Sequence, residues 1–298
     1  MLGKRFNEFI KNEASLWDKL ITFPQYCIPQ HFLSMAMYRI TRCEKTWFKN
    51  LFIRFIVKIY KVDVDEAAET DLNTYPSFNA FFTRELKPDA RPVDEQAEIV
   101  SPVDGVLSQL GELATGQLVH AKGHDYSVLE LLGGDTELAE QFQSGQFATI
   151  YLSPRDYHRI HMPLTGKLTK MRYVPGQLFS VSLRTVEAVP KLFANNERVI
   201  VSFDTEFGPM VMVLIGAIFV GSMETVWSGQ VTPPYGKAIQ QWTYLDDQAI
   251  SLQKGEEMGR FNMGSTVVML FGDQAQDIKE QMTEGAFVRM GEALTQLD

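Results

Sequence analysis

The clearest hydrophobic period in the chain lies near its N-terminus, in residues 46–61 (TWFKNLFIRFIVKIYK). Apolar side chains recur there every three or four residues, which is the spacing of one face of a helix. The face consists of Phe48, Leu51, Phe52, Phe55, Ile56, Ile59 and Tyr60. A second apolar stretch, residues 28–38, precedes it. The pattern predicts two consecutive amphipathic helices, which either lie on a membrane surface or pack on the protein's own core.

The pattern changes after residue 99, where short apolar runs alternate with Gly, Pro, Asp and Asn. These runs predict β-strands, and a helical stretch in residues 127–144 interrupts them. The runs are Phe147–Leu152, Val199–Phe203, Met210–Val220 and Thr266–Phe271. We therefore expect an α+β fold in which N-terminal membrane-facing helices precede a β-rich catalytic body. The predicted division is a basic helical region over residues 1–75 and a β-rich domain over residues 76–298.

Length and apolar content argue against a membrane-spanning helix. The longest apolar run, residues 210–221, is shorter than the roughly 18 residues that a bilayer requires, and it predicts a buried strand. The N-terminus lacks the apolar centre of a secretory signal. Two cysteines, Cys27 and Cys43, form no disulfide framework and no CxxC zinc motif. These features favour a reducing compartment.

Charge is distributed unevenly along the chain, whose net charge is −9. Residues 1–61 carry 11 Lys/Arg and 4 Asp/Glu, a net charge of +7, so the rest carries −16. The acidic body argues against nucleic acid as a partner, because phosphates require a basic surface. The basic helices suit an anionic membrane instead.

Two of the five histidines, His158 and His161, lie close together in residues 151–163 (YLSPRDYHRIHMP). Imidazoles transfer protons near neutral pH, so the pair is a candidate for acid–base catalysis. The HxxH spacing also occurs in zinc sites, but a third ligand is missing. Ordinary surface or core histidines are the remaining alternative, for this pair and equally for His120 and His124.

Two further short motifs have a chemical interpretation. Asp104-Gly105 follows an apolar run and indicates either a turn or a carboxylate that orients an imidazole. Gly264-Ser265 places a hydroxyl directly after a residue without Cβ, whose carbonyl is therefore open to attack. The segment does not match the GxSxG nucleophile elbow of hydrolases.

Together these residues resemble the bacterial phosphatidylserine decarboxylase proenzymes. The resemblance is carried by Asp104-Gly105, Tyr157-His158-Arg159-Ile160-His161-Met162-Pro163 and Gly264-Ser265-Thr266. It extends to residues 77–84 (SFNAFFTR), 121–126 (AKGHDY), 192–198 (LFANNER), 205–209 (TEFGP), 221–227 (GSMETVW) and 254–261 (KGEEMGRF). These motifs span nearly the whole chain in order. Met263 stands where the family's LGST signature has leucine, and the two reacting residues are kept.

The resemblance implies a chain that cleaves itself between Gly264 and Ser265, giving a β chain of residues 1–264 and an α chain of residues 265–298. Ser265 becomes a covalent pyruvoyl group, and no metal is implied. His161, oriented by Asp104, is the implied base of an Asp-His-Ser triad. His158 is the implied proton donor during turnover, and Tyr151 is a candidate for the substrate pocket.

By the same resemblance, the reaction is decarboxylation of phosphatidylserine to phosphatidylethanolamine through a Schiff base with the pyruvoyl group. The substrate resides in the bilayer, so the protein is expected to attach peripherally to the cytoplasmic face of the cell membrane. Its implied oligomeric state is a homodimer of αβ units.

Three other interpretations remain open from the residues alone. The first is a serine hydrolase that uses Asp104, His161 and Ser265 on an external substrate without self-cleavage. The second is a non-catalytic scaffold on a membrane surface. The third is a pyruvoyl decarboxylase for a soluble amino acid, against which the basic apolar N-terminus argues.

Overall fold

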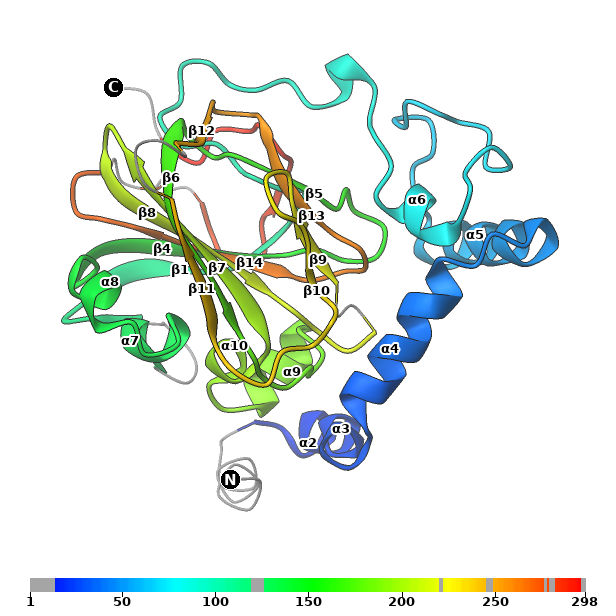
Figure 1. The fold of residues 1–298 in the computed structure, drawn as a ribbon, viewed down its shortest axis with the longest axis horizontal. Coiled ribbons are helices and arrows are strands. Elements are labelled where there is room, and N and C mark those ends of the chain that lie inside the picture. The colour runs from blue at the N-terminus through cyan, green and yellow to red at the C-terminus, as the bar shows by residue number, and fades with distance from the viewer. Residues whose placement is uncertain are drawn as a thin grey trace.

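The computed structural model describes residues 14–118, 126–219, 222–244, 249–275, 278 and 282–295. Helices come first along the chain and a β-rich body follows, which confirms the predicted α+β class (Figure 1). The helices are α2 (Leu16–Thr22), α3 (Pro24–Cys27), α4 (Gln30–Thr41), α5 (Thr46–Tyr60), α6 (Phe78–Phe82), α7 (Val128–Leu131), α8 (Thr136–Glu140), α9 (Leu183–Ala188) and α10 (Leu192–Asn195), with a 3₁₀ turn η1 (Pro88–Ala90). The two predicted amphipathic helices correspond to α4 and α5.

The strands of the described residues form two antiparallel sheets. The larger sheet has 11 strands in the order β11-β6-β7-β8-β14-β4-β1-β2-β3, with β12 paired to β6 and β15 to β1; the smaller has the order β10-β9-β13-β5. The strands are β1 (Gly105–Ala114), β2 (Gln117–Leu118), β3 (Tyr126–Ser127), β4 (Ser144–Tyr151), β5 (Arg159–His161), β6 (Gly166–Val174), β7 (Arg198–Thr205), β8 (Gly208–Ile215), β9 (Met223–Thr225), β10 (Gly229–Thr232), β11 (Gln240–Thr243), β12 (Ser251–Leu252), β13 (Glu257–Phe261), β14 (Thr266–Phe271) and β15 (Phe287–Val288).

Strand β14 lies in the middle of the larger sheet, between β4 and β8, and every one of its residues is buried. Val267 and Met269 belong to the hydrophobic cluster on one face of the sheet, and Val268 and Leu270 belong to the cluster on the other face. Burial on both faces explains why this strand appears in the sequence as a continuous apolar run without alternation. The four predicted strand runs correspond to β4, β7, β8 and β14, although β8 ends at Ile215.

The chain passes from β13 in the smaller sheet to β14 in the larger one through a short link, residues 262–265. The candidate bond between Gly264 and Ser265 lies in this link. His161 belongs to the neighbouring strand β5, where it pairs with Glu257 of β13, and His158 directly precedes that strand. The topology therefore brings the HxxH segment beside the candidate bond.

Helix α5 has two apolar faces. Its inner face packs against α6 in a cluster of buried residues: Ile53, Val62, Tyr75, Phe78, Phe81 and Phe82. Its outer face exposes a row of residues spaced four apart: Trp47, Leu51, Phe55 and Ile59. Helix α5 thus packs on the body, as one of the two sequence interpretations predicts, and it also exposes apolar surface; its contact with a membrane remains a prediction. Among the described residues, none of the helices combines the length and apolar character that a bilayer crossing requires.

Candidate active site

Ser265 is completely buried, and its Oγ has no hydrogen-bond partner among the described residues. The backbone around it is nevertheless fixed. Its carbonyl oxygen accepts from the amide of Leu152 at 2.9 Å. Upstream, the amide nitrogen of the Asn262 side chain donates to Ser222 Oγ and Glu224 Oε1, both at 2.8 Å. Because buried polar groups are nearly always paired, an unpaired hydroxyl in a fixed link is a candidate reactive group.

The packing around residue 264 does not require a glycine at this position. A Cβ placed on this residue would lie 3.4 Å from the carbonyl oxygen of Leu152 and 3.6 Å from Cε1 of His158, which are ordinary contact distances. The same distances show that the His158 imidazole lies directly against this residue.

The His158 imidazole is completely buried and stacks on Phe82 of α6 with a centroid separation of 4.1 Å. Its Nε2 lies 3.1 Å from the carbonyl oxygen of Ser153. A carbonyl only accepts, so Nε2 carries the proton and Nδ1 keeps the free lone pair. That Nδ1 has no partner among the described residues. Burial, assisted by the charge of Arg84, lowers the pKa of His158 to about 3, so the ring is neutral at pH 7.

The His161 imidazole has a partner on each nitrogen. Nδ1 donates to the carbonyl oxygen of Gly255 at 2.7 Å, and Nε2 accepts from the hydroxyl of Tyr157 at 3.0 Å. Burial lowers the pKa of His161, so this ring is neutral as well. With the proton on Nδ1, its Nε2 is the basic nitrogen, which is the tautomer that a general base in a triad requires.

Asp104 is buried and fully paired. It accepts from Arg91 through Nε at 2.8 Å and Nη2 at 2.5 Å, and from the amide of Met290 at 2.9 Å. No hydrogen bond joins Asp104 to His161, or His161 to Ser265, among the described residues, so the expected orientation of His161 by Asp104 is not seen. Gly255 holds the ring instead. The charge of Asp104 still favours the protonated form of His161, which raises its pKa against the effect of burial.

Tyr151, the candidate pocket residue, ends strand β4 opposite Thr266, so it adjoins the candidate bond. Its side chain is half-buried, and burial raises the pKa of its hydroxyl. The sequence did not single out Phe82, Ser153 or Gly255 individually. Phe82 belongs to residues 77–84, which entered only through the resemblance. His120 and His124 lie outside the described residues.

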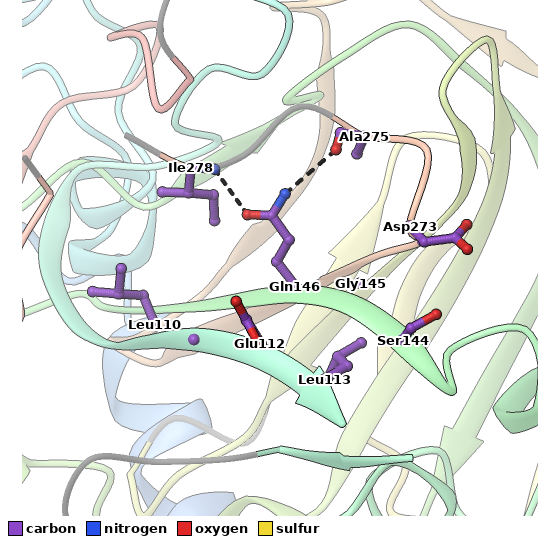
Figure 2. A pocket seen from close by; sticks show the side chains of 11 residues that line it. Leu110, Glu112, Leu113, Ser144, Gly145, Gln146, Asp273, Ala275 and Ile278 are labelled. Carbon is purple, nitrogen blue, oxygen red and sulfur yellow. Dashed lines mark hydrogen bonds between the residues drawn. The ribbon is translucent and has the colours of Figure 1, made fainter. Parts of the chain in front are cut away.

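A separate cavity of about 490 Å³ lies at the other end of the same strands (Figure 2). Gln146 of β4 lines it, accepting from the amide of Ile278 at 2.8 Å. Its charged lining residues, Glu112 and Asp273, are acidic, which disfavours an anionic lipid headgroup. The six residues of β14 separate it from Ser265 by about 20 Å, at roughly 3.3 Å per residue. No three His, Cys, Asp or Glu side chains of the described chain are arranged to hold a metal ion.

Ser265 is buried within the fold directly after a glycine, in the link between the two sheets. This arrangement is suited to a self-processing enzyme precursor. Comparison with known proteins identifies the family. The family model described as phosphatidylserine decarboxylase matches residues 78–296, and a second model, described as PSD, matches residues 20–61.

Curated relatives match nearly the whole chain. The phosphatidylserine decarboxylase proenzyme of Nitrosococcus oceani is 52% identical over 95% of this chain and 92% of its own length. Those of Idiomarina loihiensis and Alkalilimnicola ehrlichii are 50% and 55% identical, over 94% and 87% of this chain and 97% and 91% of their own lengths. The chain belongs to the phosphatidylserine decarboxylase family, a family of carboxy-lyases.

Proposed function

We propose that this protein decarboxylates phosphatidylserine to phosphatidylethanolamine after cleaving itself between Gly264 and Ser265. Family membership supports the reaction, and the proenzyme names of the relatives support a precursor that is processed. The observation that carries the site is the buried, unpaired Oγ of Ser265 next to a glycine carbonyl. The resulting β chain comprises residues 1–264 and the α chain residues 265–298.

In the proposed cleavage, Ser265 Oγ attacks the carbonyl carbon of Gly264. A C–O bond forms, the peptide C–N bond breaks, and the hydroxyl proton passes through the base to the freed amine of Ser265. Removal of the Ser265 α-proton then expels the Gly264 carboxylate, and water replaces the nitrogen, which leaves as ammonia. The new N-terminus of the α chain is a pyruvoyl group, and the new C-terminus of the β chain is Gly264.

His161 is the proposed base, with Asp104 and Ser265 as the other members of the triad. Its tautomer is correct, because Gly255 holds the proton on Nδ1 and leaves Nε2 basic. The Tyr157 hydroxyl on Nε2 must give way to the Ser265 hydroxyl or pass its proton on. Asp104 contributes charge that stabilises the imidazolium as it forms, from a position fixed by Arg91.

The residues around position 265 fit a pyruvoyl group, since Ser265 Oγ and His158 Nδ1 are both buried without partners beside the same bond. That group supplies a carbonyl that accepts the electron pair released when the substrate loses CO2. His158 is the proposed proton donor to the reacting carbon. Its ring is held by Phe82 and Ser153 against residue 264, and an anionic substrate raises its pKa from the low value in the free site. Tyr151 is a proposed wall of the pocket.

We further propose that the N-terminal helices attach the protein peripherally to anionic lipid on the cytoplasmic face of the membrane. The exposed row on α5 and the exposed Trp17 and Leu20 of α2 supply apolar surface. The +7 charge of residues 1–61 contributes about 1 kcal/mol per basic residue near such a surface. The inner face of α5 packs on α6, whose Phe82 stacks on His158, so the membrane helices lie next to the active site.

Intact-protein mass spectrometry combined with a CO2-release assay tests the proposal. We expect two masses, one for residues 1–264 and one for an α chain that begins with a pyruvoyl group, and CO2 release from vesicles containing phosphatidylserine. A single full-length mass in active protein would refute self-cleavage. If that intact protein also hydrolysed esters and were labelled at Ser265 by a phosphonate, the serine hydrolase would be the correct interpretation.

Vesicle flotation tests the membrane proposal separately. Binding to anionic vesicles should exceed binding to neutral ones and weaken with added salt. Replacing Trp47, Leu51 and Phe55 together with glutamine should release the protein from both. Undiminished flotation of that variant would refute a role for the α5 row. The homodimer of αβ units remains a prediction that light scattering of the processed protein can test.

A further inference from the structure

Arg84 is a buried arginine with an unpaired guanidinium. The residue is 4% exposed, its Nε is buried without a partner, and its side chain makes no hydrogen bond or ion pair in the described chain. Its guanidinium carbon lies 5.3 Å from the ring centre of Phe81. Burial lowers the pKa of Arg84, but a guanidinium is not deprotonated in proteins near neutral pH, so the group remains charged at pH 7. A buried cation without a counter-ion is costly and needs an explanation.

The place of Arg84 in the fold connects it to the active site. It follows α6 by two residues, and Phe82 at the end of that helix stacks on His158. Thr83 between them is fixed through its carbonyl oxygen, which accepts from Arg159 Nε at 3.0 Å. The charge of Arg84 acts on the His158 imidazole, which itself contacts Gly264. The unpaired cation therefore lies in the electrostatic surroundings of the candidate bond.

Other arginines in this region already have carboxylate partners. Arg91 pairs with Asp104 and Glu66, Arg159 with Glu85 and Glu257, Arg260 with Glu224 and Glu257, Arg42 with Glu224, Arg155 with Asp156, and Arg289 with Glu66. Asp104 and Glu66 also attract Arg84 through charge, but the hydrogen bonds of both carboxylates go to Arg91. Arg84 is thus the arginine of this group that has no carboxylate partner among the described residues.

We propose that Arg84 binds the anionic phosphodiester of the substrate headgroup and is thereby a specificity-determining residue. This inference rests on the proposed function. The headgroup carries two anions, a carboxylate and a phosphodiester, and both match a guanidinium. Pairing with the carboxylate would stabilise a negative charge that this group loses when it departs as neutral CO2, so it would favour the ground state over the transition state. Pairing with the phosphodiester anchors the substrate without that penalty.

The test compares two amphiphilic substrates in the same micelles: phosphatidylserine, and an O-alkylserine that keeps the amine and carboxylate but lacks phosphate. For Arg84→Gln we expect kcat/KM on phosphatidylserine to fall about 10- to 100-fold, the value of one charge-assisted contact. On O-alkylserine it should change less than about threefold on the same scale. Arg84→Lys should lie between wild type and Arg84→Gln. Arg184→Gln, which removes an exposed charge on α9, is the matched control and should resemble wild type.

Processing is measured first by intact mass, and rates are expressed per cleaved chain. Glycerophosphoethanolamine should inhibit the wild type competitively and Arg84→Lys and Arg84→Gln progressively less. Equal losses on both substrates would assign Arg84 to the carboxylate or to structure and overturn the proposal, as would an unchanged rate. Failure of both variants to cleave would place Arg84 in maturation and also overturn it. A wild type that releases no CO2 from phosphatidylserine would instead refute the proposed function.

Discussion

Two buried polar regions flank strand β5, and they differ in how completely their atoms are paired. Around His158 and Ser265, one imidazole nitrogen and two hydroxyls, those of Ser265 and Thr266, have no partner among the described residues. Around His161 and Asp104, both imidazole nitrogens are bonded and the carboxylate accepts from Arg91 and from a backbone amide. The two histidines are separated by only two residues, yet their surroundings differ fundamentally.

The difference indicates a division of labour. A paired network fixes the protonation state and tautomer of its imidazole, so it suits a base that must be neutral and correctly oriented before cleavage. The unpaired His158 Nδ1 and Ser265 Oγ, in contrast, have an acceptor and a donor available beside the bond where we propose cleavage. If this division is real, substitutions in the two regions affect different steps.

Replacing Ser265 with alanine should abolish cleavage and decarboxylation completely, because the nucleophile is lost. Stability should be unchanged or slightly higher, since the hydroxyl that is removed has no partner to leave unpaired. Intact mass, CO2 release and thermal melting measure the three effects. Ser108→Ala, which removes a hydroxyl that donates to the carbonyl oxygen of Thr149, is the matched control and should still cleave. Cleavage of the Ser265→Ala chain at residue 264 would refute the mechanism.

Replacing each of the two histidines with glutamine should impair a different step. His161→Gln should slow cleavage by about 10²- to 10⁴-fold, the usual effect of losing a general base. His158→Gln should still cleave but lose CO2 release by a similar factor. A time course of intact mass, followed by CO2 release per cleaved chain, distinguishes the steps. His31→Gln, at a half-exposed histidine on α4, controls for loss of an imidazole. If His158→Gln blocked cleavage while His161→Gln did not, the roles would have to be exchanged.

Some parts of this fold and site could be predicted from the sequence, and others could not. Helix α5 and strand β14 were predictable, because their periodicity and continuous apolar run follow directly from burial on one or two faces. Asp104, His158, His161 and Ser265 were selected by residue type and by the resemblance. Their partners were not predictable. The carbonyl of Gly255 reaches His161 from 94 residues away, and the amide of Met290 reaches Asp104 from 186 residues away.

Such contacts depend on strand register and on the crossing from one sheet to the other, which local patterns do not specify. The same reason explains why the pairing of Asp104 with Arg91 was missed, although both residues were visible in the sequence. Nothing in the order of residues distinguishes Arg84, which lacks an ion pair, from Arg91, which has two.

Asp104→Asn tests whether the paired region acts by charge or only as a scaffold. Breaking a buried ion pair should cost about 3 kcal/mol of unfolding free energy, because Arg91 loses its main partner. Cleavage should slow about tenfold for each 1.4 kcal/mol of lost imidazolium stabilisation. The double variant Asp104→Asn/Arg91→Met also removes the buried guanidinium, which Asp104→Asn leaves with Glu66 as its carboxylate partner, so it should recover much of the stability while cleavage remains slow. Urea unfolding and intact mass report the two effects. Cleavage at the wild-type rate in the double variant would show that Asp104 is structural only.

The last prediction concerns acid stability and tests whether the buried His158 imidazole is neutral. The pKa of this imidazole is about 3 in the folded protein and about 6.5 when unfolded, so between these values the unfolded state binds the extra proton. Its contribution to stability is complete above pH 6.5 and is lost by about 1.4 kcal/mol per pH unit as the pH falls toward 3.

His158→Gln should therefore show a shallower decline of unfolding free energy between pH 6.5 and 4 than the wild type, in urea titrations at each pH. Carboxylates contribute equally to both proteins, so the difference in slope belongs to this one ring. His31→Gln should change the slope less, because that imidazole is only half-buried. Identical slopes in wild type and His158→Gln would mean that His158 is protonated in the folded state. It would then already carry the proton that turnover requires, and the contrast between the two regions would no longer rest on a neutral, unpaired nitrogen.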